Sequence, residues 1–348
     1  MMGTMAWRIG AVVLLRCWLA GACSSFMMSS GDDSLATISA RTMDLGYGAF
    51  SLAAVPRGQG GGNASSSLGY VGAYAVLEKF PKVGVEQVIT AGINEAGLSC
   101  DMQTLEGSSY PPYPGPNARP VMVGVFCTWV LSTFRSVDEV HEALASGAAV
   151  VYGPDGFAQH FVVRDATGVS LVAEFVDQTT RLYLDGNDNG ETGFGIMTNE
   201  PEFPFHLTNA QHLEWKLGLA RPAVNTPGNF YPDERFLRLH LLKSALEVPS
   251  TEKEKIMQAV HLLNSVTVPP GQQRGTDSGS AEGMGDHTVF AFIYDHVNAV
   301  LYFRSAGNQS LQRVRLADLD LQAGSPTKTL AIENDLDWYV NAAQAFTS

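Results

Sequence analysis

The stretch LAGACSSF, at positions 19–26, places a cysteine directly after a short apolar segment. A cysteine thiolate is a strong nucleophile, and a cysteine that begins a mature chain also carries an α-amino group. That amine titrates near 7.7 to 8.0 in free peptides, so part of it is neutral near pH 7 and can take a proton from the thiol. Cys23 can therefore combine nucleophile and base in one residue, provided that the chain is cut before it.

Residues 1–22 have the features of a cleaved export signal. Arg8 precedes the apolar run IGAVVLLRCWLAGA, which is too short to span a membrane and ends in small residues of the A-x-A type. Cleavage after Ala22 would make Cys23 the first residue of a mature domain that spans residues 23–348. We therefore expect an exported protein, either periplasmic or secreted.

Two alternatives stay open for this segment. A lipoprotein signal also places a cysteine directly after the cut, although the branched apolar residue expected three positions earlier is Ala20 here. Cys23 would then be lipidated, and the chain would be a lipid-anchored, catalytically inactive binding protein. In the other alternative the leader is not cleaved, and Cys23 is a small buried hydrophobic residue.

The residues after Cys23 predict a hairpin that brings charged groups to the cysteine. A turn cluster, SGDDS, separates two runs of apolar and β-branched residues. With the turn centred near Asp32, antiparallel pairing places Cys23 opposite Arg41, whose guanidinium would favour the thiolate. Asp44 could orient the α-amine. Its odd spacing from Arg41 places it on the other sheet face unless the strand ends or bends at Met43.

Composition limits the other functions. The net charge is −13, or about −15 once the two arginines of the leader are removed, which argues against nucleic-acid binding. Basic runs and zinc-ligand spacings are absent, so we predict no metal and no cofactor. The cysteines outside the leader are Cys23, Cys100 and Cys127, which allow at most one disulfide. A third alternative is therefore a protein in which Cys100 and Cys127 are bonded and Cys23 has no chemical role.

Four ordered segments resemble the choloylglycine hydrolase family, which includes bile salt hydrolases and penicillin V acylases within the N-terminal nucleophile hydrolases. The first is Cys23 together with ARTMD at 40–44. The others are AGINEAGLSCD at 91–101, MTNEP at 197–201 and GNFYPDERFLR at 228–238. They are similar to the family's glycine-asparagine-glutamate, threonine-asparagine-x-proline and catalytic-arginine segments. Together they cover most of the mature chain.

The resemblance implies a set of catalytic residues: a nucleophile, a charged pair beside it, a polar residue near it and a second arginine that stabilises the transition state. In that order, the matching positions are Cys23, Arg41, Asp44, Asn199 and Arg235. Without the resemblance, Asn199 would indicate a turn before a proline, and Arg235 would indicate the exposed face of an amphipathic helix.

One position departs from the family pattern. Relatives carry an asparagine or tyrosine that helps to form the oxyanion hole, ten residues after the asparagine of the NE pair. Counting from Asn94 gives Thr104, whose hydroxyl can donate a hydrogen bond but has a shorter reach. The main-chain N–H of Thr104 is the alternative donor.

The order of predicted elements is that of a single α/β domain. Helical periodicity occurs at 136–146, 233–246 and 251–265, and hairpins are predicted around 165–168 and 295–298. The resemblance implies that such elements form two sheets packed face to face and covered by helices. This is a four-layer αββα sandwich of the N-terminal nucleophile hydrolase type.

We therefore predict an exported amidase that hydrolyses linear carbon–nitrogen bonds other than peptide bonds by way of a thioester acyl-enzyme. Arg41 and Arg235 would form a cationic patch for a small-molecule N-acyl amide with a carboxylate or lactone on one side and an apolar acyl group on the other. Penicillin V, N-acyl homoserine lactones and conjugated bile salts fit this description, and export favours the first two. A homo-oligomer is compatible with the sequence. No nucleic-acid partner is expected, and no membrane partner unless Cys23 is lipidated.

Overall fold

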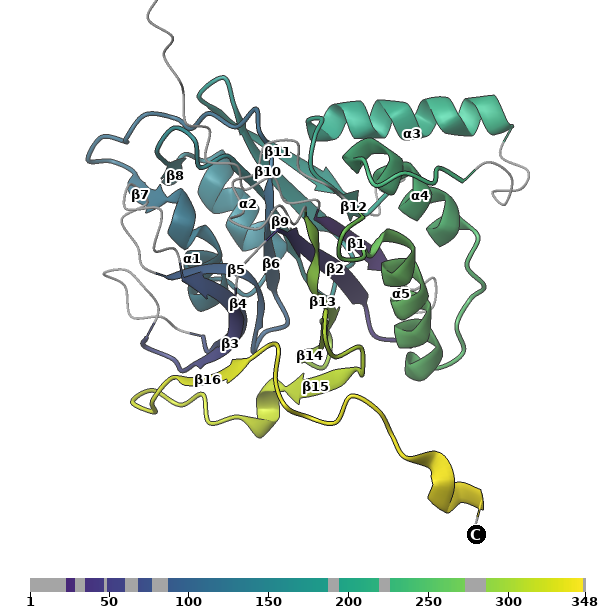
Figure 1. Cartoon of the computed structure of the whole chain (residues 1–348). Helices are drawn as coiled ribbons and strands as arrows, with labels where there is room; N and C mark the ends of the chain where they lie inside the picture. Colours follow the sequence, from purple (N-terminus) through teal and green to yellow (C-terminus); the bar gives the residue numbers. More distant parts are fainter. Residues whose placement is uncertain are drawn as a thin grey trace, which may run out of the picture.

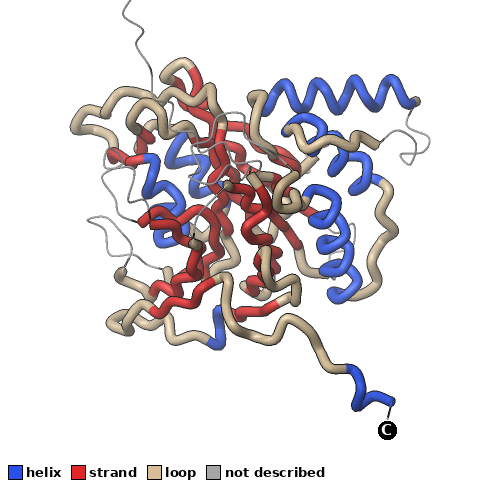
Figure 2. The backbone as a smooth tube through the Cα atoms, viewed as in Figure 1, coloured by secondary structure: helices blue, strands red, loops and turns tan. Residues whose placement is uncertain are grey.

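Two β-sheets lie face to face at the centre of the computed structural model, and helices cover their outer surfaces (Figure 1). The structure describes residues 23–28, 35–46, 49–59, 68–76, 87–186, 194–218, 226–272 and 286–346. The predicted leader and the predicted turn near Asp32 lie outside these residues. Figure 2 shows the strands gathered in the middle of the molecule with helices on both sides. The described part of the chain therefore has the predicted four-layer αββα architecture.

Within the described residues, one sheet has six strands in the order β12-β1-β2-β13-β14-β15, and all neighbours are antiparallel. Its strands are β1 (Ser24–Met28), β2 (Ile38–Leu45), β12 (Ile196–Met197), β13 (His287–Asp295), β14 (Val300–Ser305) and β15 (Gln312–Arg315). This six-stranded sheet carries the predicted nucleophile at the start of β1.

The second sheet has eight strands over the described ranges, in the order β11-β10-β9-β6-β5-β4-β3-β16. Its strands are β3 (Phe50–Val55), β4 (Tyr70–Val76), β5 (Gln87–Asn94), β6 (Ser99–Thr104), β9 (Gln159–Arg164), β10 (Ser170–Val176), β11 (Thr179–Asp185) and β16 (Lys328–Ala331). A short parallel pair, β7 (Arg119–Met122) and β8 (Ala149–Tyr152), lies beside it.

Helices form the two outer layers. The helices α1 (Phe126–Thr133) and α2 (Val137–Ala145) pack on the eight-stranded sheet. The helices α4 (Pro232–Ser244) and α5 (Glu252–Val266) pack on the six-stranded sheet. A further long helix, α3 (Phe203–Leu217), packs on α4. The predicted helices at 136–146, 233–246 and 251–265 are confirmed as α2, α4 and α5. The predicted hairpins are confirmed as β9–β10 and β13–β14.

The sequence did not predict α1 or α3, and the reason lies in their burial patterns. Within α1, six of the eight residues are buried, so no polar face marks the helical period. In α3 the opposite holds, because Phe203, His206 and Ala210 are its buried residues and the apolar stripe is narrow.

Apolar side chains fill the spaces between the layers. Phe126 and Val130 of α1 pack against Phe161 and Phe175 of the eight-stranded sheet. A second cluster joins the six-stranded sheet to α3, α4 and α5, and a third lies between the two sheets and includes Cys23. Burial on both faces explains why β1 and β2 consist entirely of buried residues.

The hairpin prediction was right in topology and wrong in register. Ser25, not Cys23, lies opposite Arg41, because the pairing of β1 with β2 is shifted by two residues from the one predicted. A shift of two residues leaves every side chain on its original face, since side chains alternate with a period of two. Cys23 and Arg41 therefore still share the face directed toward the second sheet.

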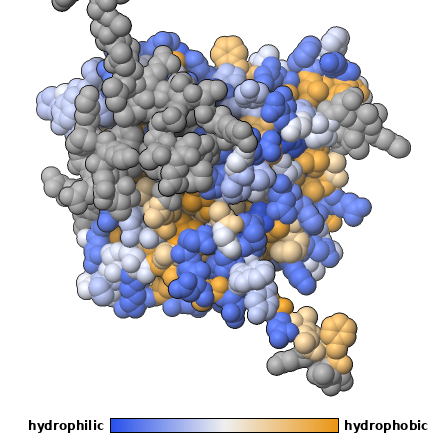
Figure 3. All heavy atoms as spheres, in the orientation of Figure 1, coloured by the Kyte–Doolittle hydropathy of each residue, from blue (hydrophilic) through white to orange (hydrophobic). Residues whose placement is uncertain are grey.

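The C-terminal segment, coloured yellow in Figure 1, stays bonded to the body of the molecule through Leu336 and Trp338, and its last part extends away from it. Figure 3 shows hydrophobic residues on this segment, and Val340 and Phe346 are highly exposed there. Among the described helices, none combines the length and the apolar character that crossing a bilayer requires.

Candidate active site

Cys23 lies immediately before β1 and is buried between the sheets, with 2% of the residue exposed. The Nη2 atom of Arg41 donates to Cys23 Sγ at 3.4 Å. The sulfur also lies 3.7 Å from Met43 Sδ and accepts a hydrogen bond from the main-chain N–H of Asp44. Within the described residues Cys23 is the free cysteine, so the predicted nucleophile is a thiol in contact with a cation.

Arg41 is fully buried and joins the two sheets. Its Nη1 atom donates to the carbonyl oxygens of Thr90 on β5, at 2.9 Å, and Met102 on β6, at 3.2 Å. Its Nη2 atom faces Cys23 and donates to the Thr42 carbonyl at 3.2 Å. One end of the guanidinium is therefore fixed by the eight-stranded sheet, and the other end is presented to the sulfur.

The electrostatics of the thiol are a balance of opposing effects. Burial raises the pKa of the Cys23 thiol, because a thiolate is poorly solvated there, and the charge of Arg41 lowers it in part. The net effect is that the pKa of the Cys23 thiol is raised. A base is therefore needed to take the thiol proton near neutral pH.

Arg235, from α4, holds the main chain at Cys23 from the helix side of the six-stranded sheet. Its Nη1 atom donates to the Cys23 carbonyl oxygen at 2.5 Å and to Ser24 Oγ at 2.6 Å. Its Nη2 atom donates to Asn199 Oδ1 at 2.9 Å. The interpretation of Arg235 as an exposed helical residue is wrong, because the residue is fully buried and faces the sheet.

Asp44 lies on the same side as Arg235, as its odd spacing from Arg41 predicted. The strand does not end at Met43 but continues to Leu45, and its pairing with β13 is irregular next to Asp44. Asp44 accepts hydrogen bonds from Thr288 Oγ1 at 2.5 Å and from Thr42 Oγ1 at 3.3 Å. Burial raises its pKa to about 7, against the opposing effects of Arg235 and Thr288.

Asn199 connects Arg235 to the end of β6. Its Nδ2 atom donates to the main-chain carbonyl oxygen of Thr104 at 2.9 Å. The main-chain carbonyl oxygen of Asn199 lies 3.1 Å from His206 Nε2. Thr104 follows Gln103, whose side chain reaches Ser25 between the sheets at 3.0 Å, so strand alternation places the Thr104 side chain on the opposite face. We therefore assign the contact between Thr104 and the site to its main chain.

The structure thus gathers all the predicted site residues around the start of β1, from both sides of the sheet. Sequence reasoning missed Ser24 and Thr42, which connect Cys23 to Arg235 and Asp44, and it missed His206. It also missed Asp101 and Arg164, which are buried behind Arg41. The alternation of polar residues at 99, 101 and 103 along β6 was the one available signal for Asp101.

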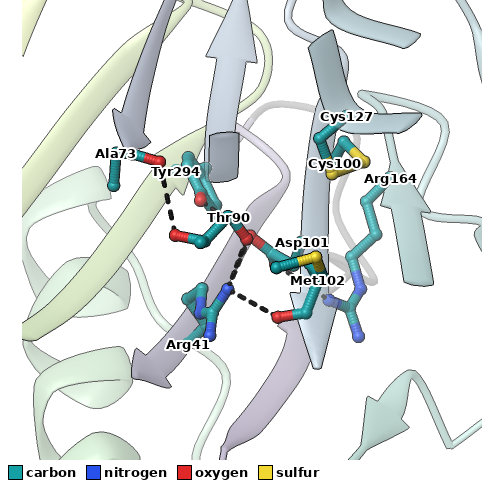
Figure 4. The surroundings of a disulfide bond; sticks show 9 residues. All are labelled: Arg41, Ala73, Thr90, Cys100, Asp101, Met102, Cys127, Arg164 and Tyr294. Carbon is teal, nitrogen blue, oxygen red and sulfur yellow. Dashed lines mark hydrogen bonds and ion pairs between the residues drawn. A yellow bond between two sulfur atoms is a disulfide. The ribbon is translucent and has the colours of Figure 1, made fainter. Parts of the chain in front are cut away.

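Cys100 and Cys127 form a disulfide that joins β6 to α1 (Figure 4). The pairing named in the third sequence alternative is therefore present, and it lies on the face of β6 opposite Asp101. The described residues contain no cluster of histidine, cysteine and carboxylate side chains arranged to hold a metal ion.

Comparisons with known proteins identify the family of this chain. Residues 23–330 match the family described as linear amide C–N hydrolases, choloylglycine hydrolase family. The chain is 26% identical over 318 residues to a bile salt hydrolase/transferase of Clostridium perfringens, a match that covers 83% of this chain and 91% of the relative. It is 25% identical over 260 residues to a penicillin V acylase of Pectobacterium atrosepticum, covering 69% and 65% of the two chains.

Solved structures show the same fold. A variant of the conjugated bile acid hydrolase from Clostridium perfringens superimposes with a TM-score of 0.75 at 22% identity, covering 92% of this chain and 100% of the other. Penicillin V acylase from Agrobacterium tumefaciens gives a TM-score of 0.70 at 24% identity, covering 88% and 91%. The match over residues 23–330 shows that this chain belongs to the choloylglycine hydrolase family of linear amide C–N hydrolases.

Proposed function

We propose that this chain is an exported amidase in which Cys23, exposed by cleavage after Ala22, is the catalytic nucleophile. The observation that carries the proposal is the placement of the Cys23 thiol at the start of β1, with Arg41 on its sulfur and Arg235 on its carbonyl oxygen. The family match begins at residue 23, which supports a mature domain that starts there.

The proposed reaction begins with proton transfer from the thiol to the α-amine of Cys23. The thiolate attacks the amide carbonyl, and the leaving amine takes the proton from the α-ammonium as the carbon–nitrogen bond breaks. Water then adds to the thioester, which releases the acid and restores the thiol. The raised pKa of the buried thiol supports a mechanism with a built-in base.

The oxyanion of each tetrahedral intermediate needs hydrogen-bond donors near the sulfur. Asn199 uses one of its two amide hydrogens on the Thr104 carbonyl oxygen, and Arg235 fixes its Oδ1 atom. This leaves the amide of Asn199 oriented beside the main chain of Cys23. We assign Asn199 and the main chain near Thr104 to the oxyanion site.

We assign Asp44 to holding the α-amine. The Ser24 N–H donates to Thr42 Oγ1 at 3.1 Å, and Thr42 Oγ1 donates to Asp44 Oδ2. The Thr42 hydroxyl thus links the Asp44 carboxyl group to the main chain of Ser24, the residue next to Cys23. A released α-ammonium would give this carboxylate an additional cationic partner.

The proposed substrates are small N-acyl amides with an apolar acyl group and an amine part that carries a carboxylate or a lactone. Arg41 and Arg235 lie on opposite faces of the six-stranded sheet and do not form the single cationic patch expected from the sequence, but their two positive charges beside Cys23, in a chain of net charge −13, support an anionic or polar amine part. We place penicillin V and N-acyl homoserine lactones before conjugated bile salts, because we propose that this chain is exported and the resemblance associates bile salt substrates with cytoplasmic enzymes.

The test is amine release from penicillin V, an N-acyl homoserine lactone and a glycine-conjugated bile salt by the processed protein. We expect cleavage of at least one substrate, and a loss of at least about three orders of magnitude in kcat for Cys23→Ala. A Cys23→Ser variant keeps the size of the side chain and should also be strongly impaired. Activity of Cys23→Ala equal to that of the wild type would overturn the proposal.

The mass of the mature N-terminus separates the proposal from its alternative. An unmodified Cys23 as first residue supports the amidase. A diacylglyceryl adduct on the Cys23 sulfur would support the lipid-anchored binding protein instead, and it would leave no free thiol for the reaction.

A further inference from the structure

We propose that Asp101 is a positioning residue that sets the charge behind the nucleophile, so that Arg41 and Arg164 together present a single net positive charge to the Cys23 sulfur. This inference deepens the proposed function, because it concerns the same thiol. It rests on a buried cluster that lies between the two sheets and consists of Arg41, Asp101, Arg164 and Tyr294, here called the inter-sheet cluster.

The cluster draws its members from four strands. Figure 4 shows Arg41 and Arg164 on either side of Asp101. Arg41 Nη1 lies 3.9 Å from Asp101 Oδ1, and Arg164 Nη1 lies 3.8 Å from Asp101 Oδ2. Tyr294 Oη donates to Asp101 Oδ1 at 2.8 Å. All four side chains are buried, so water screens these charges little.

Asp101 acts mainly through charge. Its Oδ1 atom accepts the bond from Tyr294, whereas its Oδ2 atom is buried without a hydrogen-bond donor. A carboxylate retained for its hydrogen bonds would use both oxygens. The two arginines lie just beyond hydrogen-bonding distance and are held by other acceptors, which for Arg164 are Ser170 Oγ, Ser25 Oγ and the Gly195 carbonyl oxygen.

The position of Arg41 transmits this charge to the sulfur. Its Nη1 end faces Asp101 and its Nη2 end contacts Cys23 Sγ. Two guanidinium groups and one carboxylate carry a net charge of +1, which matches one thiolate. Without the carboxylate the thiolate would face two uncompensated buried cations, and without Arg164 it would face a neutral pair.

Other charged groups surround the cluster but are paired elsewhere. Asp185 acts on Arg164 and is itself opposed by Lys243, while Asp44 acts on Arg41 and is opposed by Arg235 from the helix side. His296, which also lies near Arg164, has its pKa lowered to about 4 by burial and is neutral near pH 7. Arg41, Asp44 and Arg235 all act on the Cys23 thiol, but Asp44 and Arg235 oppose each other, so we assign the net charge on the inter-sheet side to Arg41, Asp101 and Arg164.

The test measures the titration of Cys23 in Asp101→Asn, in Arg164→Met and in the double variant, without substrate. The ultraviolet absorbance of the thiolate is recorded against pH, and the same variant carrying Cys23→Ala supplies the matched baseline. We expect the titration midpoint to fall by about one pH unit in Asp101→Asn and to rise by a similar amount in Arg164→Met. In the double variant it should return to the wild-type value, because Arg41 alone again carries a charge of +1.

The pattern of shifts decides the outcome. The proposal would be overturned in favour of a purely structural role if the titration midpoints of both single variants shifted in the same direction. It would also be overturned if the midpoint of the double variant differed from the wild-type value. If Asp101→Asn does not fold, Arg164→Met and the double variant can still be compared, because they differ only in the Asp101 carboxylate. Equal titration midpoints in these two variants would also overturn the proposal. If Cys23 proves not to be the nucleophile, activity would survive Cys23→Ala while the predicted midpoints would still be observed.

Discussion

Two buried arginines hold the start of β1 from opposite faces of the six-stranded sheet, and their surroundings differ. Burial lowers the pKa of both guanidinium groups, but for Arg41 the nearby Cys23 and Asp101 outweigh burial and the pKa is raised. For Arg235 burial prevails over the attraction of Asp44, and the pKa is lowered. Arg41 thus lies among groups that can carry negative charge, whereas Arg235 donates mainly to neutral oxygens.

The difference teaches that the two faces have separate tasks. On the face between the sheets, Arg41 contacts the sulfur of Cys23, so its positive charge acts directly on the thiol. On the helix side, Arg235 fixes the carbonyl oxygen of Cys23 and the side chains of Ser24 and Asn199. If Cys23 is the nucleophile, as we propose, the first arrangement tunes its reactivity, and the second fixes the geometry of its main chain.

The comparison is tested most strongly by removing the charge from the sulfur side. In Arg41→Met we expect kcat to fall by about 10² to 10³, because the thiolate loses its contacting cation. The unfolding temperature should also fall, because the carbonyl oxygens of Thr90, Met102 and Thr42 lose their donor, but Asp101 stays paired with Arg164 and no buried charge is left alone. Steady-state kinetics together with thermal unfolding would measure both effects.

Arg235→Met is the counterpart of Arg41→Met on the other face. Its main effect should be a lower unfolding temperature, because three buried acceptors lose their donor. The comparison breaks if Arg235→Met leaves stability intact and lowers kcat as much as Arg41→Met does.

The disulfide tests how far the inter-sheet face depends on the eight-stranded sheet. It anchors β6, and this strand carries Asp101 and the Met102 carbonyl oxygen that accepts from Arg41. The bonded cysteines are separated by 27 positions, and a crosslink of this span stabilises a protein by about 3.5 kcal/mol. In Cys100→Ala/Cys127→Ala we expect a loss of this size in urea unfolding. Cys23→Ala, which removes a buried sulfur without a crosslink, is the matched control, and an equal loss in both proteins would contradict the prediction.

The sequence could predict much of the inner face because strand alternation tolerates errors. The predicted register of β1 on β2 was wrong by two residues, yet Cys23 and Arg41 were correctly placed on one face, because side chains repeat every two residues. The same rule placed Asp44 on the other face. The αββα layering and the placement of Asn199 and Arg235 at the site came instead from the resemblance, since no local pattern brings residues 199 and 235 to the start of β1.

Asp101 shows what the sequence could not supply. Its partners come from β2, β9 and β13, which are separated from β6 by up to 193 positions, so only the packed sheets bring them together. Contacts of this kind depend on how two sheets face each other, and neither hydrophobic period nor turn chemistry specifies that. For the same reason the contact of Thr104 through its main chain became evident only with the strand in place.

The smallest expected effect concerns the helix side, where Asp44 is buried with a pKa of about 7. A folded-state pKa above the unfolded value means that the folded chain binds the proton more tightly, so stability from this group is present at low pH and is lost as pH rises through about 7. In the full-length chain we expect the free energy of unfolding to fall by about 2 to 3 kcal/mol more between about pH 5 and about pH 8 in the wild type than in Asp44→Asn. Urea titrations of both proteins at the two pH values measure this difference, and parallel profiles would contradict it. Release of the α-amine of Cys23 should reduce the difference, because an α-ammonium beside Asp44 would lower the pKa of its carboxyl group.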